Sequence, residues 1–369
     1  MQRREFMKTV AMGTGAILLD GFGSGQTLAK GTVFPGIRKI IKPLAIAMWD
    51  FSWLLRHHPA GEFEDWDRVL DGLAERGYNA IRMDAFPHLV AAAPDGKVTE
   101  EYYYPKGDWV PAMWGNTYTM YARPREGLLE FLPKCRARNI RVGLATWFMA
   151  YADQIQGLDG FVRVWDETLA FLQQHDLLDN TLYVDVLNEY PFFHGFNWLK
   201  QKINEVKDSK AEEVLPAGED KSGANQWQAV TAKYNEVQRS YYKHFITAAL
   251  QKLSAKWPGL DFFASQTYNF EAPWQDMDYS QYAAMDIHYW FMMHEKLNGG
   301  TGYWENIHNI GSCPNDLGFA QVQKKVQENW NGNKTELVEW MENNIREIAE
   351  IGKKWNIPYG NTEGWGPIN

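Results

Sequence analysis

The chain has 369 residues, a formal net charge of −9 and no run of Lys and Arg beyond its N-terminus. This length suits a (β/α) barrel with insertions, which ranges from about 200 to more than 400 residues, and the acidic balance argues against nucleic acid as a partner. Aromatic residues make up 15% of the chain, with 17 Trp, 18 Tyr and 19 Phe. Such a content exceeds what a core alone requires, and flat rings at a cleft mouth suit the apolar faces of sugars.

The N-terminus resembles an export signal. Paired arginines at Arg3–Arg4 precede an uncharged run over Thr9–Leu19, a pattern similar to a twin-arginine signal. That run is too short to span a bilayer, which takes about 20 residues. Small residues ending at Ala29 predict cleavage there. Residues 1–29 would then be a signal peptide, and residues 30–369 one catalytic domain in the periplasm or outside the cell, with no stable membrane insertion.

Apolar, β-rich runs alternate with helical patterns along the rest of the chain, which predicts a parallel sheet with crossover helices. The predicted strands are Leu44–Trp49, Asn79–Met83, Ile140–Thr146, Leu182–Leu187, Asp261–Gln266, Ala283–His288 and Ile357–Thr362. The predicted helices are Trp66–Glu75, Arg125–Arg138, Phe161–His175, Trp227–Lys256 and Glu336–Lys354. Insertions are expected near residues 86–121 (an aromatic loop), 196–225 (a polar surface segment) and 291–333.

The predicted fold class is therefore α/β, a (β/α)8 TIM barrel, although only seven of its eight strands are evident. Either the first strand has an unrecognised partner, or the barrel lacks its eighth strand and helix, or the sequence is a truncated form of a longer protein. We favour truncation, because the sequence ends at Asn369, shortly after the seventh strand.

Polar and aromatic side chains stand at the carboxyl ends of these strands, where α/β barrels carry their catalytic groups. The residues at or just past those ends are Trp49, Asp50, Arg82, Trp147, Asn188, Glu189, Tyr268, His288, Tyr289, Glu363 and Trp365. Glu189 and Glu363 follow the fourth and seventh strands. A retaining glycosidase needs two such carboxyl groups, one to protonate the leaving oxygen and one to attack the anomeric carbon.

The strand ends resemble the retaining glycoside hydrolases of clan A, most closely the cellulase-like relatives of family five. The resemblance implies that Asn188 bonds the sugar 2-hydroxyl, that Glu189 is the acid/base, and that Glu363 is the nucleophile. The run Gly77-Tyr78-Asn79-Ala80-Ile81-Arg82 looks like the family's G-x-N-x-x-R segment, whose Arg braces the nucleophile. His288 matches the histidine that ends the sixth strand.

Three departures from the family pattern indicate a divergent member with an altered substrate. Trp290 stands where the sixth strand of the family usually has a tyrosine that contacts the nucleophile. The third strand ends in Ala145-Thr146-Trp147 in place of a His-rich segment. The eighth strand, often the source of a sugar-stacking Trp, is not evident.

The resemblance also implies how the two glutamates share the chemistry. Arg82, always charged, should keep Glu363 ionised, while Glu189 needs a raised pKa to hold its proton near neutral pH. The two carboxyl groups should lie ~5–5.5 Å apart. The expected function is retaining hydrolysis of β-linked oligo- or polysaccharides, without a cofactor.

Other interpretations remain open. The chain could be a barrel that binds glycans without cleaving them, or an intracellular barrel enzyme acting on phosphorylated metabolites; the latter lacks the expected Gly-rich phosphate loop. His57–His58 and the His288…His294 pair match no known metal spacing, and no carboxylate completes a set, so no metal is expected. Cys135 is expected to be a buried small hydrophobe, and a disulfide with Cys313 stays open.

Overall fold

A computed structural model describes residues 36–40, 43–104, 119–148, 155–191, 196–209, 234–267, 274–289, 294–301 and 317–364. The chain divides into two units, Met1–Thr32 and Val33–Asn369, and every described residue belongs to the second. The proposed signal peptide therefore lies outside the described residues. Within them, no helix is both long enough and apolar enough to cross a membrane.

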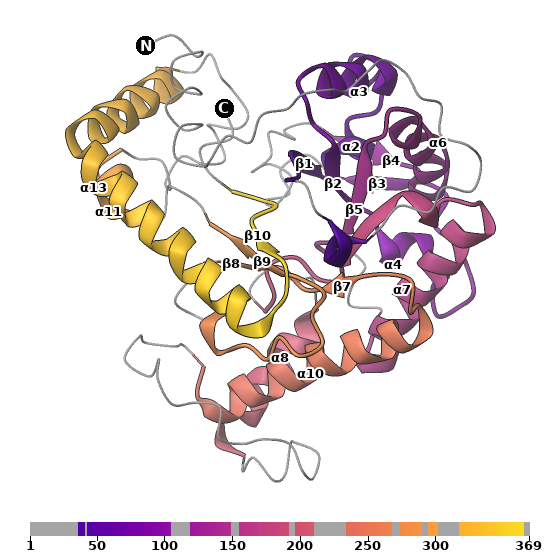
Figure 1. The fold of residues 1–369 in the computed structure, drawn as a ribbon. Coiled ribbons are helices and arrows are strands. Elements are labelled where there is room, and N and C mark those ends of the chain that lie inside the picture. The colour runs from indigo at the N-terminus through magenta and orange to yellow at the C-terminus, as the bar shows by residue number, and fades with distance from the viewer. Residues whose placement is uncertain are drawn as a thin grey trace. The chain divides into compact units, whose positions relative to one another are not determined.

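Among the described residues, eight short parallel strands build the centre of this unit (Figure 1). Five pair in the order β1 (Ile46–Asp50), β2 (Ala80–Asp84), β5 (Arg141–Ala145), β6 (Thr181–Asp185) and β7 (Phe262–Phe263). Three more pair in the order β8 (Gln266–Thr267), β9 (Met285–His288) and β10 (Tyr359–Gly360). Two residues separate β7 from β8, so these two strands together occupy the single position predicted at Asp261–Gln266 and join the two ladders.

Full burial explains why the central strands read as apolar runs. Every residue of β2, β5 and β6 is buried, which is typical of parallel strands covered on both faces. Gly143 in β5 allows a close approach, since a Cβ there would lie 2.1 Å from the ring of Tyr183. The few polar residues that these strands do contain are therefore held inside the fold.

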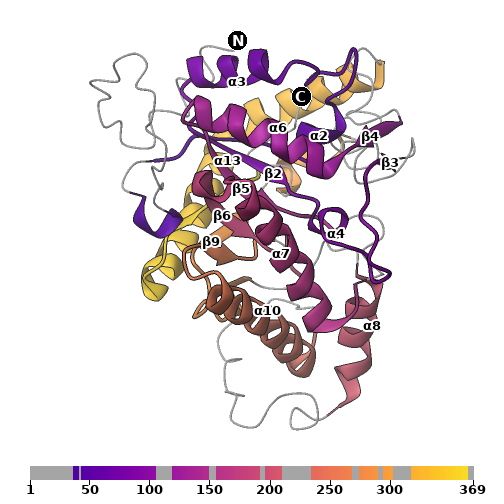
Figure 2. The same ribbon diagram turned by 90° about the vertical axis from the view of Figure 1, so that its right-hand side faces the viewer.

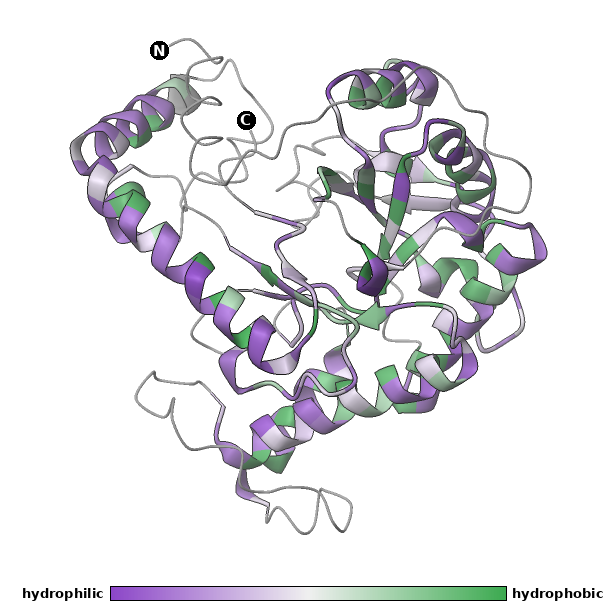
Figure 3. Ribbon diagram, in the orientation of Figure 1, coloured by the Kyte–Doolittle hydropathy of each residue, from purple (hydrophilic) through white to green (hydrophobic). Residues whose placement is uncertain are grey.

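Amphipathic helices connect the strands, so the predicted strand–helix alternation is confirmed. They are α3 (Trp66–Glu75), α6 (Pro124–Ala137), α7 (Gly157–Gln174), α10 (Glu236–Lys256) and α13 (Leu317–Trp355). α7 and α10 pack side by side (Figure 2). Hydrophobic residues gather on the strands and on helix faces turned towards them (Figure 3). The described part of α10 starts at a capping box, in which Asn235 and Gln238 bond each other's backbone N–H groups.

All three predicted insertions contain regular structure. The segment at 196–225 includes α8 (Asn197–Glu205) and η4 (Val206–Asp208). The aromatic loop includes α4 (Pro87–Val90) and a hairpin of β3 (Tyr102–Tyr104) and β4 (Met120–Ala122). The insertion at 291–333 holds α11 (Glu295–Asn298) and the first half of α13. The helix predicted at Glu336–Lys354 corresponds to the second half of α13, and a helical segment within the insertion precedes it. A kink at Asn333, whose φ of −126° and ψ of 17° are not helical, separates the two.

Shorter elements complete the described chain. They are η1 (Ile37–Lys39), α2 (Ser52–Leu55), η3 (Leu178–Asn180), α8 (Asn197–Glu205), η4 (Val206–Asp208) and η5 (Trp274–Asp276). Cys135 on α6 is buried and carries a free thiol, as expected of a small hydrophobe, and burial raises its pKa. Cys313 lies outside the described residues.

Candidate active site

Arg82 stands at the centre of the strand ends, buried near the end of β2. Its Nη1 donates to both carboxylate oxygens of Asp50, at 2.6 Å each, and to Glu363 Oε2 at 3.0 Å. Its Nη2 donates to Asp185 Oδ2 at 2.7 Å and to Asn188 Oδ1 at 2.5 Å. Burial lowers the pKa of Arg82, but the three carboxylates raise it well above its usual value. The guanidinium of Arg82 thus hydrogen-bonds to residues at the carboxyl ends of β1, β6 and β10, and it comes from β2 itself.

Glu189 follows β6 in a strained backbone conformation. Its φ of 47° lies in the left-handed region, which costs a residue with a Cβ about 1–2 kcal/mol. The backbone N–H of Glu189 donates to Ser265 Oγ at 3.0 Å, between β7 and β8. Its Oε1 lies 3.0 Å from His288 Nδ1. The surrounding structure therefore holds this carboxyl group in place against a modest backbone strain.

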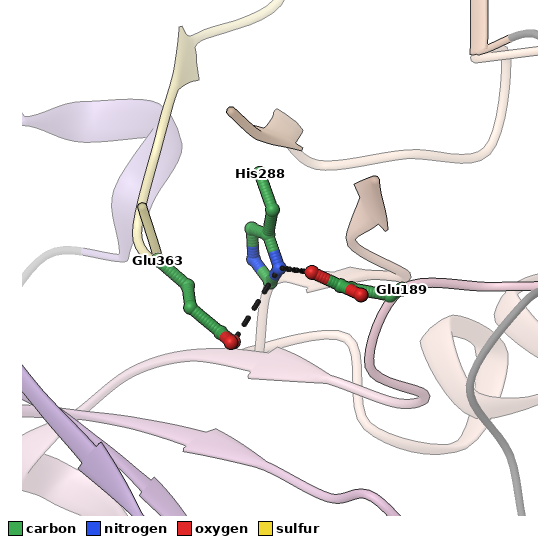
Figure 4. Close-up of side chains that lie close together, drawn as sticks. All are labelled: Glu189, His288 and Glu363. Atoms are coloured by element: carbon green, nitrogen blue, oxygen red, sulfur yellow. Dashed lines mark hydrogen bonds and ion pairs between the residues drawn. The ribbon is translucent and has the colours of Figure 1, made fainter. Parts of the chain in front are cut away.

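Glu363 follows β10 and reaches the same imidazole. Its Oε2 lies 3.4 Å from His288 Nδ1 (Figure 4). The same oxygen accepts from Arg82. Gly364 comes next with φ 154°, and a Cβ there would lie 2.4 Å from the carbonyl oxygen of Tyr289. Only glycine therefore suits this exit from the strand, which aims Glu363 at His288.

The pKa of Glu363 differs from the expectation that Arg82 keeps this group ionised. Burial raises the pKa well above its usual value; His288 and Arg82 oppose the shift, and Asp50 and Glu189 add to it. The physical reason is that the cost of burying the charged carboxylate exceeds the stabilisation that His288 and Arg82 provide. Burial also lowers the pKa of His288, but Glu363, Asp286 and the bond to Glu189 outweigh it and raise the pKa well above 6.5.

The carboxyl groups of the two glutamates are close neighbours. One oxygen of Glu189, one oxygen of Glu363 and Nδ1 of His288 all lie within 4.8 Å of one another, and all three residues are buried. Carboxylate oxygens and imidazole nitrogens are common metal ligands, so these three residues could form part of a metal site. The sequence-based expectation that no carboxylate would lie beside His288 to complete a set of metal ligands was wrong. Arg82 at 3.0 Å from Glu363 already supplies a positive charge there and would repel a metal cation.

The remaining predicted residues divide between the site and its surroundings. Trp147 belongs to the site, because its indole N–H donates to Asp50 Oδ2 at 2.7 Å. Trp49 contacts the ring of Phe63 edge-on, with ring centroids 6.4 Å apart. Tyr289 points towards α13, where its hydroxyl accepts a hydrogen bond from Asn344 at 2.8 Å. Tyr268, Trp290 and Trp365 lie outside the described residues.

Three buried acids in the strands were not anticipated. Asp185 binds Arg82 and also accepts from the backbone N–H of Ser265 at 2.8 Å. Asp84 accepts from the backbone of Trp147 at 3.0 Å. Asp286 binds Thr362 and lies 3.4 Å from His288 Nε2. Asp185 and Asp286 each interrupt a run that is otherwise apolar, and Asp84 ends β2. This signal could have identified them, since a buried carboxylate needs a partner.

A family model described as "Cellulase-like: Sugar-binding cellulase-like" matches residues 46–366. The chain belongs to this cellulase-like family. A Parabacteroides distasonis protein assigned to the glycoside hydrolases has a similar structure, with a TM-score of 0.65 and 26% identity over 89% of this chain and 78% of that one. Together with the parallel strands and crossover helices, these findings confirm the predicted α/β TIM-barrel fold of a glycoside hydrolase.

Two further structures are more distant. A psychrophilic glycoside hydrolase family 10 endo-β-1,4-xylanase has a TM-score of 0.37 and 11% identity, over 87% of this chain and 86% of its own. A β-glucosidase in its apo form has a TM-score of 0.33 and 12% identity, over 82% and 77%. No curated protein matches the chain.

Proposed function

We propose that this cellulase-like protein hydrolyses β-linked oligo- or polysaccharides with retention of anomeric configuration. The observation that carries the proposal is the pairing of Glu189 and Glu363, whose nearest carboxyl oxygens lie within 4.8 Å. Retaining glycosidases place these groups ~5–5.5 Å apart, and inverting ones ~6.5–9.5 Å to leave room for a water molecule. The shorter spacing supports a direct attack by one carboxylate.

In the first step, a carboxylate oxygen of Glu363 forms a bond to the anomeric carbon while the glycosidic C–O bond breaks. The leaving oxygen takes its proton from Glu189, which becomes a carboxylate. In the second step, Glu189 removes a proton from water, whose oxygen attacks the anomeric carbon and releases Glu363. Because the pKa of Glu363 is raised in the free protein, this group must first lose its proton. His288 Nδ1, at 3.4 Å, can accept that proton once the imidazolium has given its own Nδ1 proton to Glu189.

Asn188 supplies further support for a sugar ligand. An Arg guanidinium only donates hydrogen bonds, so Arg82 and the hydroxyl of Ser265 both direct the amide oxygen of Asn188 towards themselves. The Nδ2 of the same amide is buried and has no hydrogen-bond partner among the described residues. A buried donor without a partner is costly, and a sugar hydroxyl next to the two glutamates would satisfy it.

A reducing-sugar assay over a panel of β-glucans, mannans and xylans tests the proposal, with the anomeric form of the first product followed by NMR. We expect cleavage of at least one polymer to a product of retained configuration, and its loss in Glu363→Gln. Glu336→Gln is the matched control, because that residue is exposed and pairs with Lys296 on the surface. An inverted product would contradict the retaining mechanism. Binding of a polymer by the wild type without cleavage would favour the alternative of a glycan-binding barrel.

We further propose that the chain is exported through a twin-arginine signal and works in the periplasm or outside the cell. The support is the Arg3–Arg4 pair followed by the uncharged run over Thr9–Leu19. Replacing both arginines with lysine should retain the protein in the cytoplasm, as measured by cell fractionation. Unchanged export of that variant would rule out the twin-arginine route.

A further inference from the structure

Asp286 is a buried carboxylate in β9 with every oxygen engaged. Its Oδ1 accepts from the backbone N–H of Thr362 at 2.8 Å, and its Oδ2 accepts from the hydroxyl of Thr362 at 2.5 Å. Its Oδ2 also lies 3.4 Å from His288 Nε2. Asp286 therefore joins the residue immediately before Glu363 to the imidazole that faces both glutamates.

The two ring nitrogens of His288 have different neighbours. Nδ1 lies 3.0 Å from Glu189 and 3.4 Å from Glu363 (Figure 4), whereas Nε2 faces Asp286. Burial raises the pKa of Asp286, but His288, Arg82 and Thr362 outweigh it and lower the pKa below 3.8. Asp286 is therefore ionised at neutral pH and only accepts hydrogen bonds. An acceptor at this position favours the ring tautomer whose single proton is on Nε2.

We propose that Asp286 is a positioning residue that keeps one proton on Nε2 of His288, so that Nδ1 is the nitrogen that exchanges a proton with Glu189 and Glu363. Its catalytic consequence rests on the proposed glycosidase function. In the exchange, the imidazolium gives its Nδ1 proton to Glu189 Oε1. His288 becomes neutral with its Nε2 proton in place, and Glu189 becomes the carboxylic acid that the first step requires. The reverse transfer, from Glu363 to Nδ1, leaves Glu363 as the carboxylate nucleophile.

The charged groups around His288 come from its own strand and from the ends of other strands. Glu189 faces it from the exit of β6, Glu363 from the exit of β10, and Asp286 from its own strand, β9. Arg82 of β2 contacts Glu363, and Tyr183 of β6 has a pKa raised by burial above all, so it stays neutral. Among these described groups, Asp286 is the carboxylate that faces Nε2, and its loss should therefore change the ring tautomer.

The test is a ¹⁵N NMR titration of the full chain, with the signals of His288 among the nine histidines identified by their absence in His288→Gln. In the wild type we expect Nε2 to remain protonated at every pH while Nδ1 alone titrates. In Asp286→Asn the new amide can donate to Nε2, so Nε2 should lose its proton and the titration midpoint of His288 should fall. The kcat/KM on a natural glycan should fall about 10²-fold, a loss within the range of general acid–base catalysis.

Two further variants separate tautomer control from general packing. Asp276→Asn removes a carboxylate that pairs with Arg239 and Lys243 away from the glutamates, and should leave the His288 signals unchanged. Thr362→Val removes the hydroxyl that donates to Asp286 but leaves the negative charge of Asp286 in place. Nε2 of His288 should therefore stay protonated in this variant.

A wild-type Nε2 that titrates, or an Asp286→Asn variant with wild-type His288 signals, would overturn the proposal. If Asp286→Asn does not fold, the wild-type and Thr362→Val spectra still show whether Nε2 of His288 stays protonated, and loss of that proton in either would overturn the proposal. Because these spectra require no turnover, a protein that shows the expected tautomer but cleaves no glycan would contradict the glycosidase function alone.

Discussion

Asp84 offers a quantitative test of the buried electrostatics beside the site. It ends β2 with no exposed surface, and its carboxylate accepts from the backbone N–H of Phe86 at 2.7 Å and of Trp147 at 3.0 Å. Burial is the largest influence and raises the pKa from 3.8 to about 7, with Asp50 adding to the shift and the backbone bonds opposing it. Keeping Asp84 ionised in the fold therefore costs about 4 kcal/mol, at 1.36 kcal/mol per pKa unit.

The direction in which the free energy of unfolding changes with pH follows from proton binding. Between pH 3.8 and about 7 the unfolded chain has lost this proton while the folded protein retains it. The folded state then binds more protons, so raising the pH lowers the free energy of unfolding. This contribution to stability is complete below pH 3.8 and is lost as the pH rises to about 7.

Asp84→Asn should therefore give a shallower pH dependence of stability, measured by urea unfolding from pH 4.5 to pH 8. Its amide can accept from only one of the two backbone N–H groups, and the unpaired donor costs about 1–3 kcal/mol at every pH. The variant should thus be less stable than the wild type at pH 4.5 and more stable at pH 8. Asp276→Asn is the control with the same substitution. A stability difference between Asp84→Asn and wild type that stays constant over this pH range would refute the reasoning.

The other predictions concern the charged groups of the site. Glu363→Ala should abolish turnover, and azide should restore part of it with a product of inverted configuration, detected by NMR. Full activity of this variant without azide would show that Glu363 is not the nucleophile. Glu189→Ala should slow natural glycans by about 10²–10⁴-fold but aryl glycosides with good leaving groups much less, because those need no protonation; equal losses in kcat/KM on both would contradict the acid role. Arg82→Lys replaces five hydrogen bonds with at most three donors, and should lower the free energy of unfolding by about 3–6 kcal/mol; an unchanged urea midpoint would show that the network contributes nothing.

Much of the fold follows from local sequence patterns. The helix predicted at Trp66–Glu75 has those bounds in α3, because its start is signalled by Asp65, whose side chain accepts from the N–H of Arg68. The strands at Ala80–Asp84 and Thr181–Asp185 are apolar runs of ordinary strand length and were anticipated within two residues. The helix predicted at Glu336–Lys354 matches the part of α13 that follows the kink at Asn333, whereas the helical segment before the kink was not predicted.

The sequence by itself determined which residues reach the carboxyl ends of the strands, because strand alternation and the exit of each strand are local properties. Arg82, Asn188, Glu189, His288 and Glu363 were all predicted there, and the structure brings them into one hydrogen-bonded group. Only the tertiary structure decided how charge is distributed among them. Arg82 is shared with Asp50 and Asp185, and His288 is held from behind by Asp286. Asp286 and His288 share β9, but Arg82 and its carboxylate partners are separated along the chain by other strands and helices, so the pKa of each group depends on distances and burial that no local pattern encodes.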